Sequence, residues 1–408
     1  MSRWTLLFLF VALPLHAADI GKLMRQADRG STSERTAALR ELAKEDAGLA
    51  TQKAVEWLAP NVEPALRRQA ARTLWDLAEK AKPAETALRS ALGDRDDDVA
   101  YAAVGALNAM GVPKADLRAT RLRLARSSDG FIAFYAVRAL HPDPELPVDE
   151  TLGAAFSALN LAASGRPSDM KTRDSLRTNA RAFLEAFAAK SGREGFDALM
   201  AAFPKTSPPA REAIAVALRK VPTQHGDPVQ IAALLDSPQI YVRTSALYAL
   251  SEYHERAAPV VDRMIALLAT NHEPDLRKAA ASALGYTGAA PGLATDQAKT
   301  SAWRSDVEKR IGPALASTAT TDPVTEVRKE AAGSLQKLAL WAGPALGAIG
   351  ERIAREPDPV VRHALVRACW NARESPQLPK AVLASLAEGD PEQYVRNEAK
   401  SVLQAAGR

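Results

Sequence analysis

Residues 390–403 read Asp-Pro-Glu-Gln-Tyr-Val-Arg-Asn-Glu-Ala-Lys-Ser-Val-Leu, and this stretch carries the pattern that decides the fold. If Val395 is taken as an anchor, arginine follows at the next position, alanine four residues after the anchor and leucine eight residues after it. Residues four apart lie one above another on the same face of an α-helix. The stretch therefore predicts a helix that follows the Asp-Pro turn and packs its alanine and leucine against neighbouring helices.

The same frame recurs in eleven copies along the chain. The anchors are Glu34, Leu66, Val99, Ile132, Leu176, Ala210, Val242, Leu276, Val327, Val361 and Val395. Alanine stands four residues after the anchor in nine copies, and leucine stands eight residues after it in ten. Eight of the ten steps between anchors measure 32–34 residues, and the other two measure 44 and 51. A fixed period of this size is the signature of stacked repeats, each of which contacts only its neighbours.

Each unit is predicted to contain two helices. A second apolar-periodic stretch precedes each anchor helix, for example at 229–235 and 260–268, and the turn between them often holds Ser, Asp or Glu before Pro. Such residues start helices, because their oxygens accept from free backbone N–H groups and Pro fits the first turn. The low aromatic content, 5% of the chain, also favours close-packed helices.

From about residue 20 to the end at 408, the chain resembles HEAT repeats of the short bacterial kind. The acidic-Pro turn, the Val-Arg pair and the spaced Ala and Leu carry the resemblance, whereas the Thr-Pro-Leu-His signature of ankyrin repeats is absent. The resemblance implies an all-α fold, an α-solenoid (superhelix) of about eleven two-helix HEAT-like repeats. It also implies a binding scaffold, because that family has many partners and few enzymes.

The first residues have the layout of a secretory signal peptide. A short positive stretch, 1–3, precedes an uncharged apolar run of 12 residues from Trp4 to Leu15, and small residues follow up to Ala18. As a helix this run rises about 18 Å, which is too short for a bilayer core. We therefore expect a signal peptide at 1–18, an exported (periplasmic or secreted) protein and a repeat array at 19–408.

Composition and motifs point away from several classes of activity. The net charge of +5 is a small excess over 53 basic and 48 acidic residues, so nothing here favours nucleic acid. Cys369, the single cysteine, stands in the leucine column, which predicts a small buried hydrophobe. No metal or haem motif, catalytic triad or paired carboxylate appears, so we expect no cofactor, no metal and no catalytic residue.

An arginine follows the anchor in nine copies; Ala100 and Ala133 replace it in the other two. This arginine column has two interpretations that the sequence leaves open, a ladder of ion pairs within the protein or a surface for an anionic ligand. The acidic residues expected to pair with it are Asp98, Asp174, Asp236, Asp275, Asp322, Asp358 and Asp390.

Variable positions on the second helix of each unit are the better candidates for partner binding, because in solenoids of this kind that helix lines the concave face. The candidates there are Arg40, Arg68, Arg72, Arg138 and Tyr248, with Tyr101 and Phe134 at related positions. Exposed arginine and aromatic side chains suit a binding surface.

The two long steps predict insertions near 141–170 and 285–310. Extra loops in a repeat array often lie on one face and carry specific contacts. We read Gly285, Gly288 and Gly292 as part of a flexible lip, and Tyr286 and Trp303 as partner-contacting aromatics.

The function expected from the sequence is a non-catalytic extracytoplasmic scaffold that binds another protein along its concave surface. One alternative is the binding of an anionic envelope polymer through the arginines. A second is a HEAT-like enzyme such as a lyase. Binding that depends strongly on salt would distinguish the first alternative, and an activity of the purified protein the second.

Overall fold

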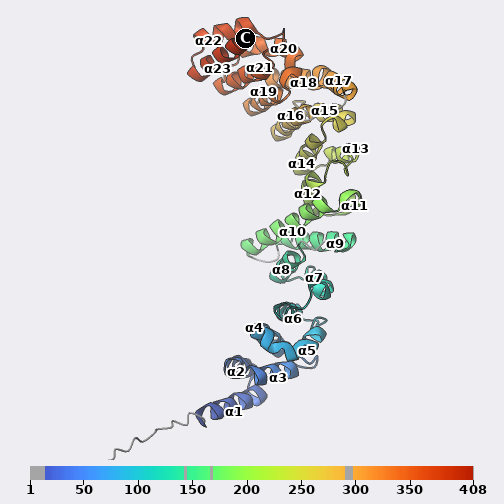
Figure 1. Ribbon diagram of the computed structural model, residues 1–408, viewed down its shortest axis with the longest axis vertical. Coiled ribbons are helices and arrows are strands. Elements are labelled where there is room, and N and C mark those ends of the chain that lie inside the picture. The colour runs from blue at the N-terminus through green and yellow to red at the C-terminus, as the bar shows by residue number, and fades with distance from the viewer. Residues whose placement is uncertain (1–13, 142–144, 166–168, 290–296, 408) are drawn as a thin grey trace, which may run out of the picture. The chain divides into compact units, whose positions relative to one another are not determined.

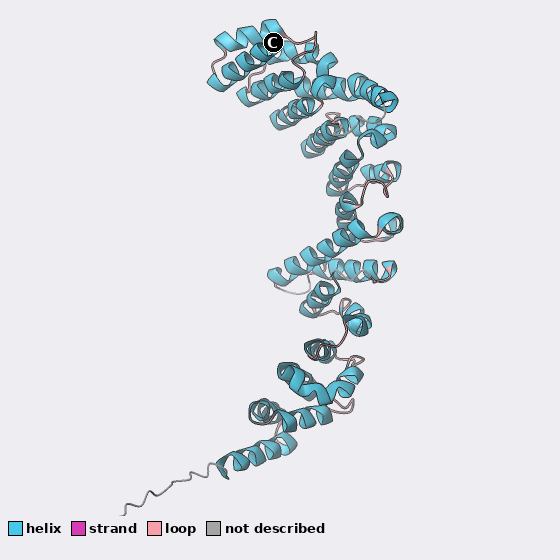
Figure 2. Cartoon of the chain, in the orientation of Figure 1, coloured by secondary structure: helices cyan, strands magenta, loops and turns pink. Residues whose placement is uncertain are grey.

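The computed structural model describes residues 14–141, 145–165, 169–289 and 297–407. These residues form helices joined by turns, and no strand occurs among them (Figure 2). The helices follow one another in pairs along the chain (Figure 1). The protein is an all-α solenoid of HEAT-like repeats, which confirms the fold expected from the period.

All eleven anchors lie in the second helix of a pair, which we call the B helix. The B helices are α2 (Thr32–Glu45), α4 (Pro64–Leu77), α6 (Asp97–Ala109), α8 (Gly130–Leu140), α10 (Met170–Lys190), α12 (Pro208–Ala217), α14 (Ile240–Leu250), α16 (Pro274–Gly288), α19 (Thr325–Lys337), α21 (Pro359–Asn371) and α23 (Gln393–Ala406). The alanine and leucine columns are buried, apart from Leu403 in the last helix, which is half-buried. Burial of these two columns is what each repeat gains from its neighbours.

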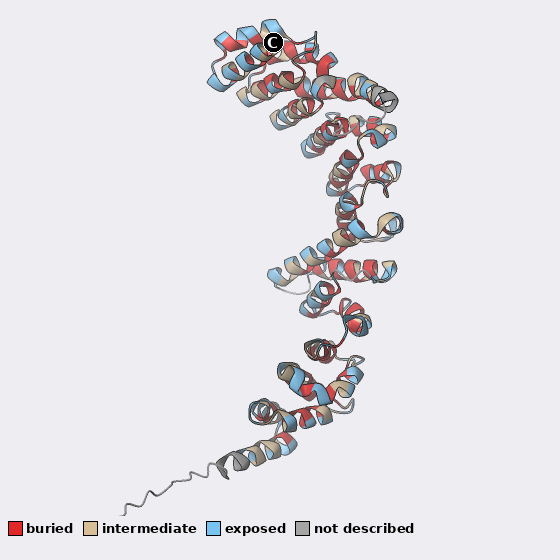
Figure 3. Cartoon of the chain, viewed as in Figure 1, coloured by how far each residue is buried: buried red, intermediate tan, exposed pale blue. Residues whose placement is uncertain are grey.

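The first helix of each pair, the A helix, is more variable in length. The A helices are α1 (Pro14–Arg29), α3 (Ala47–Trp57), α5 (Glu85–Ala91), α7 (Arg118–Leu124), α9 (Val148–Ala163), α11 (Gly192–Ala202), α13 (Pro228–Ala232), α15 (Val261–Ala266), α18 (Gly312–Thr321), α20 (Leu346–Ile353) and α22 (Lys380–Gly389). Short 3-10 helices extend several of them: η1 (Ala78–Ala84), η2 (Lys114–Leu117), η5 (Ala233–Asp236), η6 (Ser251–Val260) and η9 (Ala339–Ala345). Figure 3 shows buried residues in both the A and the B helices.

The chain divides into two compact units, 1–183 and 184–408, with the boundary inside α10. Within the first unit, α2, α4 and α6 pack side by side, whereas α6 and α8 touch much less. Within the second unit, α12, α14, α16, α19, α21 and α23 pack against one another in chain order. In α23, Asn397 and Lys400 are exposed.

The prediction that the insertions are loops is wrong for most of their length. The first insertion is largely filled by α9 and the second by α17 (Gln297–Asp306), which continues through the π-helical η8 (Val307–Ile311) into α18. Gly285 and Gly288 lie buried in α16, where a Cβ would come 2.5 Å from Ser334 and 2.4 Å from Leu338. These glycines allow α16 and α19 to approach closely. Gly292 lies outside the described residues.

Three repeats share a strained turn after the B helix. Ala78, His254 and Ala339 have φ values of 49°, 45° and 52°, a region that side chains disfavour. Each stands twelve residues after its anchor, and proline follows five residues later, at Pro83, Pro259 and Pro344. The conserved spacing within the chain indicates one turn type that leads from a B helix into the next A helix.

The start of the chain is described from Pro14, where α1 begins, so most of the predicted signal peptide lies outside the described residues. Cleavage after Ala17 or Ala18 would remove the first turn of α1. In the part of the chain that the structure describes, no helix combines the length and apolar character needed to cross a membrane.

Candidate functional site

The arginine column forms a ladder in part of the chain. Four of its arginines each make two hydrogen bonds, at 2.7–3.1 Å, to a carboxylate in the turn of the following repeat. The pairs are Arg67 with Asp94, Arg277 with Asp322, Arg328 with Glu356, and Arg362 with Asp390. All eight side chains are nearly inaccessible to solvent, so the pairs link neighbouring repeats through the interior.

Each of these carboxylates also organises its own turn. Asp390 accepts a backbone N–H bond from Glu392 at 2.9 Å, and its own carbonyl accepts from Arg396. Burial alone would raise the pKa of Asp390, but the bonds from Arg362 and from Glu392 outweigh burial and hold this pKa below its usual value. The same balance of causes lowers the pKa of Asp94 and of Glu356. These three carboxylates are therefore ionised at neutral pH.

The expected acidic partners were only partly right. The four acids of the ladder stand five residues before the next anchor, a position that Asp322 and Asp390 fill and Asp358 does not. Asp358 instead caps α21, because its Oδ1 accepts from the N–H groups of Val360 and Val361. Glu356 takes the ladder position in that repeat. Proximity along the sequence did not distinguish a cap from an ion-pair partner.

The other five column arginines also bind within the chain. Arg243 pairs with Glu273 at 2.9 Å and Arg177 with Asp174 at 3.5 Å. The remaining three donate to backbone carbonyls: Arg35 to Ala27, Arg211 to Phe203 and Pro204, and Arg396 to Asp390 and Pro391. The structural interpretation is therefore confirmed for the four buried ion pairs, whereas the Arg177 side chain is 47% exposed and pairs only within its own helix.

Three of the four arginines proposed for recognition are engaged with neighbouring side chains. Arg68 pairs with Asp96 at 2.6 Å and Arg72 with Asp98 at 3.1 Å, although both arginines remain about half exposed. Arg40 donates to Gln69 at 3.0 Å. Arg138 is exposed on α8. The acidic start of α6 thus neutralises much of the basic surface expected in this region.

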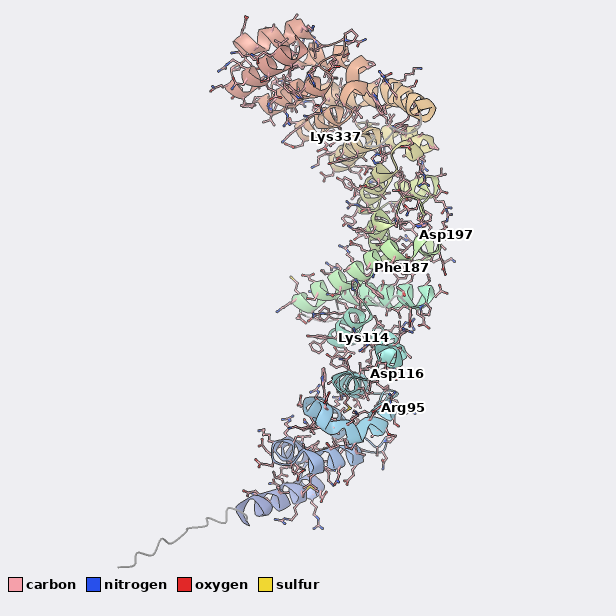
Figure 4. All side chains as sticks on the ribbon, in the orientation of Figure 1. Arg95, Lys114, Asp116, Phe187, Asp197 and Lys337 are labelled. Carbon is pink, nitrogen blue, oxygen red and sulfur yellow. The ribbon has the colours of Figure 1, made fainter. Side chains whose placement is uncertain are left out.

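The predicted aromatics lie in different environments. Tyr286 is 50% exposed, with the Lys337 ammonium 4.2 Å from its ring centre (Lys337 is labelled in Figure 4). Tyr248 is half-buried beneath the Arg219 guanidinium. Trp303 is only 3% exposed, so the prediction that it contacts a partner is wrong. Its segment is helical rather than a loop, and the indole belongs to the core.

A cluster of five aromatic side chains gathers on the B helices of the second, third and fourth repeats. The members are Trp75 in α4, Tyr101 in α6, and Phe131, Phe134 and Tyr135 in α8. Ring centres lie 5.5 Å apart between Trp75 and Tyr101, and 6.0 Å apart between Tyr101 and each of Phe131 and Tyr135. Phe131 is 52% exposed and Tyr135 36% exposed. We call this group the aromatic cluster.

A cleft of about 270 Å³ lies beside the aromatic cluster. It is lined by Trp75, Tyr101, Val104, Gly105, Asn108, Ala109, Arg121, Leu124, Tyr135, Ala136 and Ala139. Residues of α6 and α8 form its walls, and Arg121 and Leu124 come from the A helix α7 behind them. The cleft therefore lies where α6 and α8 pack sparsely against each other.

The polar groups of the cleft are few. Arg121 is 6% exposed, and its Nη2 donates to Oδ1 of Asn108 at 3.1 Å. Burial, with a smaller contribution from Tyr135, raises the pKa of Tyr101, whose hydroxyl is therefore a hydrogen-bond donor at neutral pH. Among the described residues, no three or more His, Cys, Asp or Glu side chains are grouped so that they could hold a metal ion.

The sequence interpretation named Tyr101 and Phe134 but missed Trp75, Phe131 and Tyr135. Phe131 and Tyr135 flank the anchor Ile132, in a copy where alanine replaces the column arginine. Two aromatic residues beside the anchor, in a repeat that lacks the column arginine, were the sequence signal that could have pointed to this cluster. Trp75 stands nine residues after its anchor, just beyond the frame that was compared.

No protein-family model and no curated protein matches this chain. Among solved structures, it is similar to the karyopherin Kap121p bound to the SUMO protease Ulp1p, with 15% identity, a TM-score of 0.52 and coverage of 95% of this chain and 45% of that one. A structure of Kap121p matches at 14% identity and TM-score 0.49, covering 95% of this chain and 48% of that one. The chain thus spans about half the length of these karyopherins, which are HEAT-repeat solenoids, and at this identity the likeness supports the fold alone.

Proposed function

We propose that this protein is a non-catalytic scaffold that binds another protein through the aromatic cluster and its cleft. The observation that carries the proposal is the exposure of Phe131 and Tyr135, 52% and 36%, beside an open cleft. Aromatic side chains are enriched at protein interfaces, where they bury a large apolar area with few rotatable bonds. A cluster of this kind is uncommon on surfaces that only face water.

The structural neighbour offers one parallel. Kap121p is bound there to the SUMO protease Ulp1p, so a solenoid of this kind can hold a protein partner. Carried over to this chain, that parallel supports protein binding without naming a partner. It also favours a scaffold over an enzyme, in agreement with the absence of a triad or paired carboxylates in the sequence.

The alternative of an anionic polymer is weaker. Arg68 and Arg72 already contact Asp96 and Asp98, and the column arginines bind within the chain. A polyanion would have to displace these carboxylates, whereas an apolar partner segment would not. Binding that survives about 0.5 M salt, where charges more than a few ångströms apart are screened, would favour the protein partner.

A site-specific cross-link tests the proposal. A photo-reactive amino acid replaces Tyr135 in the full chain, and the matched control places it at Tyr241, which is 44% exposed on α14 in the second unit. We expect one discrete protein adduct from position 135 at about 0.5 M salt and none from position 241. Equal labelling at both positions, or adducts that contain only polymer, would contradict the proposal.

We also propose that the protein is exported. The positive start, the apolar run and the small residues up to Ala18 support this localisation. The test is mass spectrometry of the first residue in protein purified from cells that make it naturally. A chain that begins at Ala18 or Asp19 supports export, and a chain that keeps Met1 or Ser2 contradicts it.

A further inference from the structure

We propose that Lys337 is a reactive amine that captures an apolar aldehyde as an imine, at a small site formed by Lys337 with Tyr286, Glu330 and Gly333. The site lies in the second compact unit, where α16 packs against α19. It is independent of the proposed function, because no residue of the aromatic cluster or its cleft takes part in it. The capture is stoichiometric binding and involves no turnover.

The floor of the site is one face of α19. Glu330, Gly333 and Lys337 lie three and four residues apart in turn, so they share that face of the helix. A Cβ at Gly333 would meet no heavy atom within 4 Å, so the helix surface between the two charged residues is open. The Nζ of Lys337 lies 3.7 Å from Oε1 of Glu330. A small molecule can therefore reach the amine across Gly333.

The wall of the site is the ring of Tyr286. Close packing of α16 on α19, at Gly285 and Gly288, brings this ring beside Lys337, whose Nζ lies 4.2 Å from the ring centre (Lys337 is labelled in Figure 4). Tyr286 is 50% exposed and the Lys337 side chain 27%, so both can be reached from solvent. An apolar ligand joined to the amine could cover the exposed part of the ring and remove both surfaces from water. The ring therefore favours an aldehyde with an apolar body.

Partial burial makes the Lys337 amine a better nucleophile than an exposed lysine. Burial lowers the pKa of Lys337, and Glu330 offsets only part of that effect. A larger fraction of the amine is therefore neutral at pH 7, and the neutral amine is the form that attacks a carbonyl carbon. Lys53 shows the opposite balance: burial alone would lower its pKa, but its bonds to Asp28 and Glu56 outweigh burial and raise it.

The reaction needs no partner beyond the aldehyde. The lone pair of the neutral Lys337 Nζ forms a bond to the carbonyl carbon, and the electron pair of the C=O π bond moves to the oxygen. The two protons of the amine end on that oxygen, which leaves as water, and the nitrogen forms a double bond to the carbon. Nothing is oxidised or reduced, and water can reverse the step.

Reductive trapping on the full-length protein tests the proposal. The probe is benzaldehyde at about 1 mM with sodium cyanoborohydride, which converts the imine into a stable benzyl-lysine that peptide mass spectrometry locates. The internal control is Lys329, which is exposed on the same helix. We expect trapping at Lys337 to be at least about threefold faster than at Lys329 at pH 7. The ratio should shrink at about pH 9.5, where much of the Lys329 amine is also neutral.

Variants of the wall test whether the ring belongs to the site. Tyr286→Ala exposes the amine to water and removes the apolar surface, so the ratio of Lys337 to Lys329 trapping at pH 7 should fall at least about threefold. Tyr286→Phe keeps the ring and should leave the ratio nearly unchanged. Circular dichroism and thermal unfolding check that both variants are folded.

Three outcomes overturn the proposal: equal trapping at Lys337 and Lys329 at pH 7, a ratio that is the same at both pH values, or a ratio that Tyr286→Ala leaves intact. None of them bears on the proposed function, which is judged by the cross-link at position 135. A protein adduct at position 135 would likewise leave the reactivity of Lys337 to be decided by the trapping ratio.

Discussion

The repeats from 276 to 403 and those from 99 to 140 share the same helix pairs and the same buried alanine and leucine columns, yet they differ at one position. In the later repeats Arg277, Arg328 and Arg362 each join the next repeat through a buried carboxylate. In the earlier ones Ala100 and Ala133 stand in that column. The first group of B helices packs closely, and the second leaves the aromatic cleft between α6 and α8.

The presence of the arginine pairs in one region and their absence in the other indicates how a cleft can form between repeats of one array. Small apolar columns provide burial in every repeat, and the buried ion pairs of the ladder additionally join neighbouring turns where they occur. Buried ion pairs add little net stability relative to apolar residues, but they penalise any arrangement that separates the partners. Where the ladder is interrupted, α6 and α8 pack sparsely. The cleft between them is lined by side chains that take no part in the ladder. Ser127 fills the acid position there and bonds to Asp97 instead.

The largest expected loss of stability comes from removing one carboxylate of the arginine ladder. Asp322→Ala leaves the Arg277 guanidinium, 3% exposed, without its counter-charge, and should lower the free energy of unfolding by about 3–5 kcal/mol. Urea unfolding followed by circular dichroism measures the loss. Ser127→Ala, at the same column position in the interrupted region, removes one hydrogen bond to Asp97 and should cost only about 0.5–1.5 kcal/mol. Similar losses in the two variants would mean that the ladder does not distinguish the regions.

Removal of a core leucine should affect both regions alike. Leu284 in α16 and Leu107 in α6 are both fully buried in the leucine column. Each substitution to Ala should lower the free energy of unfolding by about 2–5 kcal/mol, through lost burial and a cavity. The pair therefore tests whether the two regions differ in the ladder and not in the core. A negligible loss at Leu107 alone would place the difference in core packing.

Acid should weaken the ladder before it weakens the core. The pKa of Asp390 is lowered in the folded protein from its usual 3.8, so the pair contributes stability above pH 3.8 and loses it as the pH falls through the folded pKa. Asp390→Asn should therefore be less stable than the natural protein by about 1.5–3 kcal/mol at pH 7, and this gap should narrow as the pH falls below the usual 3.8 and through the lowered folded pKa. Urea titrations at several pH values measure the gap.

The matched control for acid is Asp262→Asn, which alters an ion pair with Arg310 whose carboxylate is 80% exposed. Exposed pairs contribute about 1 kcal/mol or less, so its unfolding curve should nearly follow that of the natural protein at every pH. A gap for Asp390→Asn that persists unchanged in acid, where the carboxylate is fully protonated, would show that the side chain acts by packing and not by charge.

The sequence predicted the repeating part of this structure well because the period records burial. Every anchor fell in a B helix, since alanine and leucine four residues apart must face the same neighbour. Cys369 was placed correctly as a buried residue of the leucine column; burial also raises the pKa of its thiol to about 12. The insertions were located, but their helices α9 and α17 were missed because extra length does not reveal whether a segment is loop or helix, and Trp303 was misplaced with them.

The candidate site was harder to foresee, because it depends on contacts between repeats. The cleft combines Trp75, Tyr101, Arg121 and Tyr135 from four different helices, and no fixed spacing links them. The ion-pair partners posed the same difficulty: Asp358 caps its helix while Glu356, two residues earlier, binds Arg328. The missing arginine at Ala100 and Ala133 was visible in the sequence, but its consequence for packing became clear only in three dimensions.

The smallest effect should be the same in both regions. Ala78 precedes the interrupted repeats and Ala339 lies within the ladder, and both hold φ near +50°, which costs a residue with a Cβ about 1–3 kcal/mol. Glycine adopts this φ freely but loses more chain entropy on folding, so each Ala→Gly substitution should raise the free energy of unfolding by about 1 kcal/mol. Glu79→Gly, one residue further along in η1, meets no such strain and should lower it by about 0.5–1 kcal/mol. Thermal unfolding of the three variants measures whether each substitution raises or lowers the free energy of unfolding. A stabilising effect at Ala78 without one at Ala339 would mean that the interrupted region also relies on a different turn. Equal stabilising effects would confine the difference between the regions to the arginine column and to the cleft beside α6 and α8.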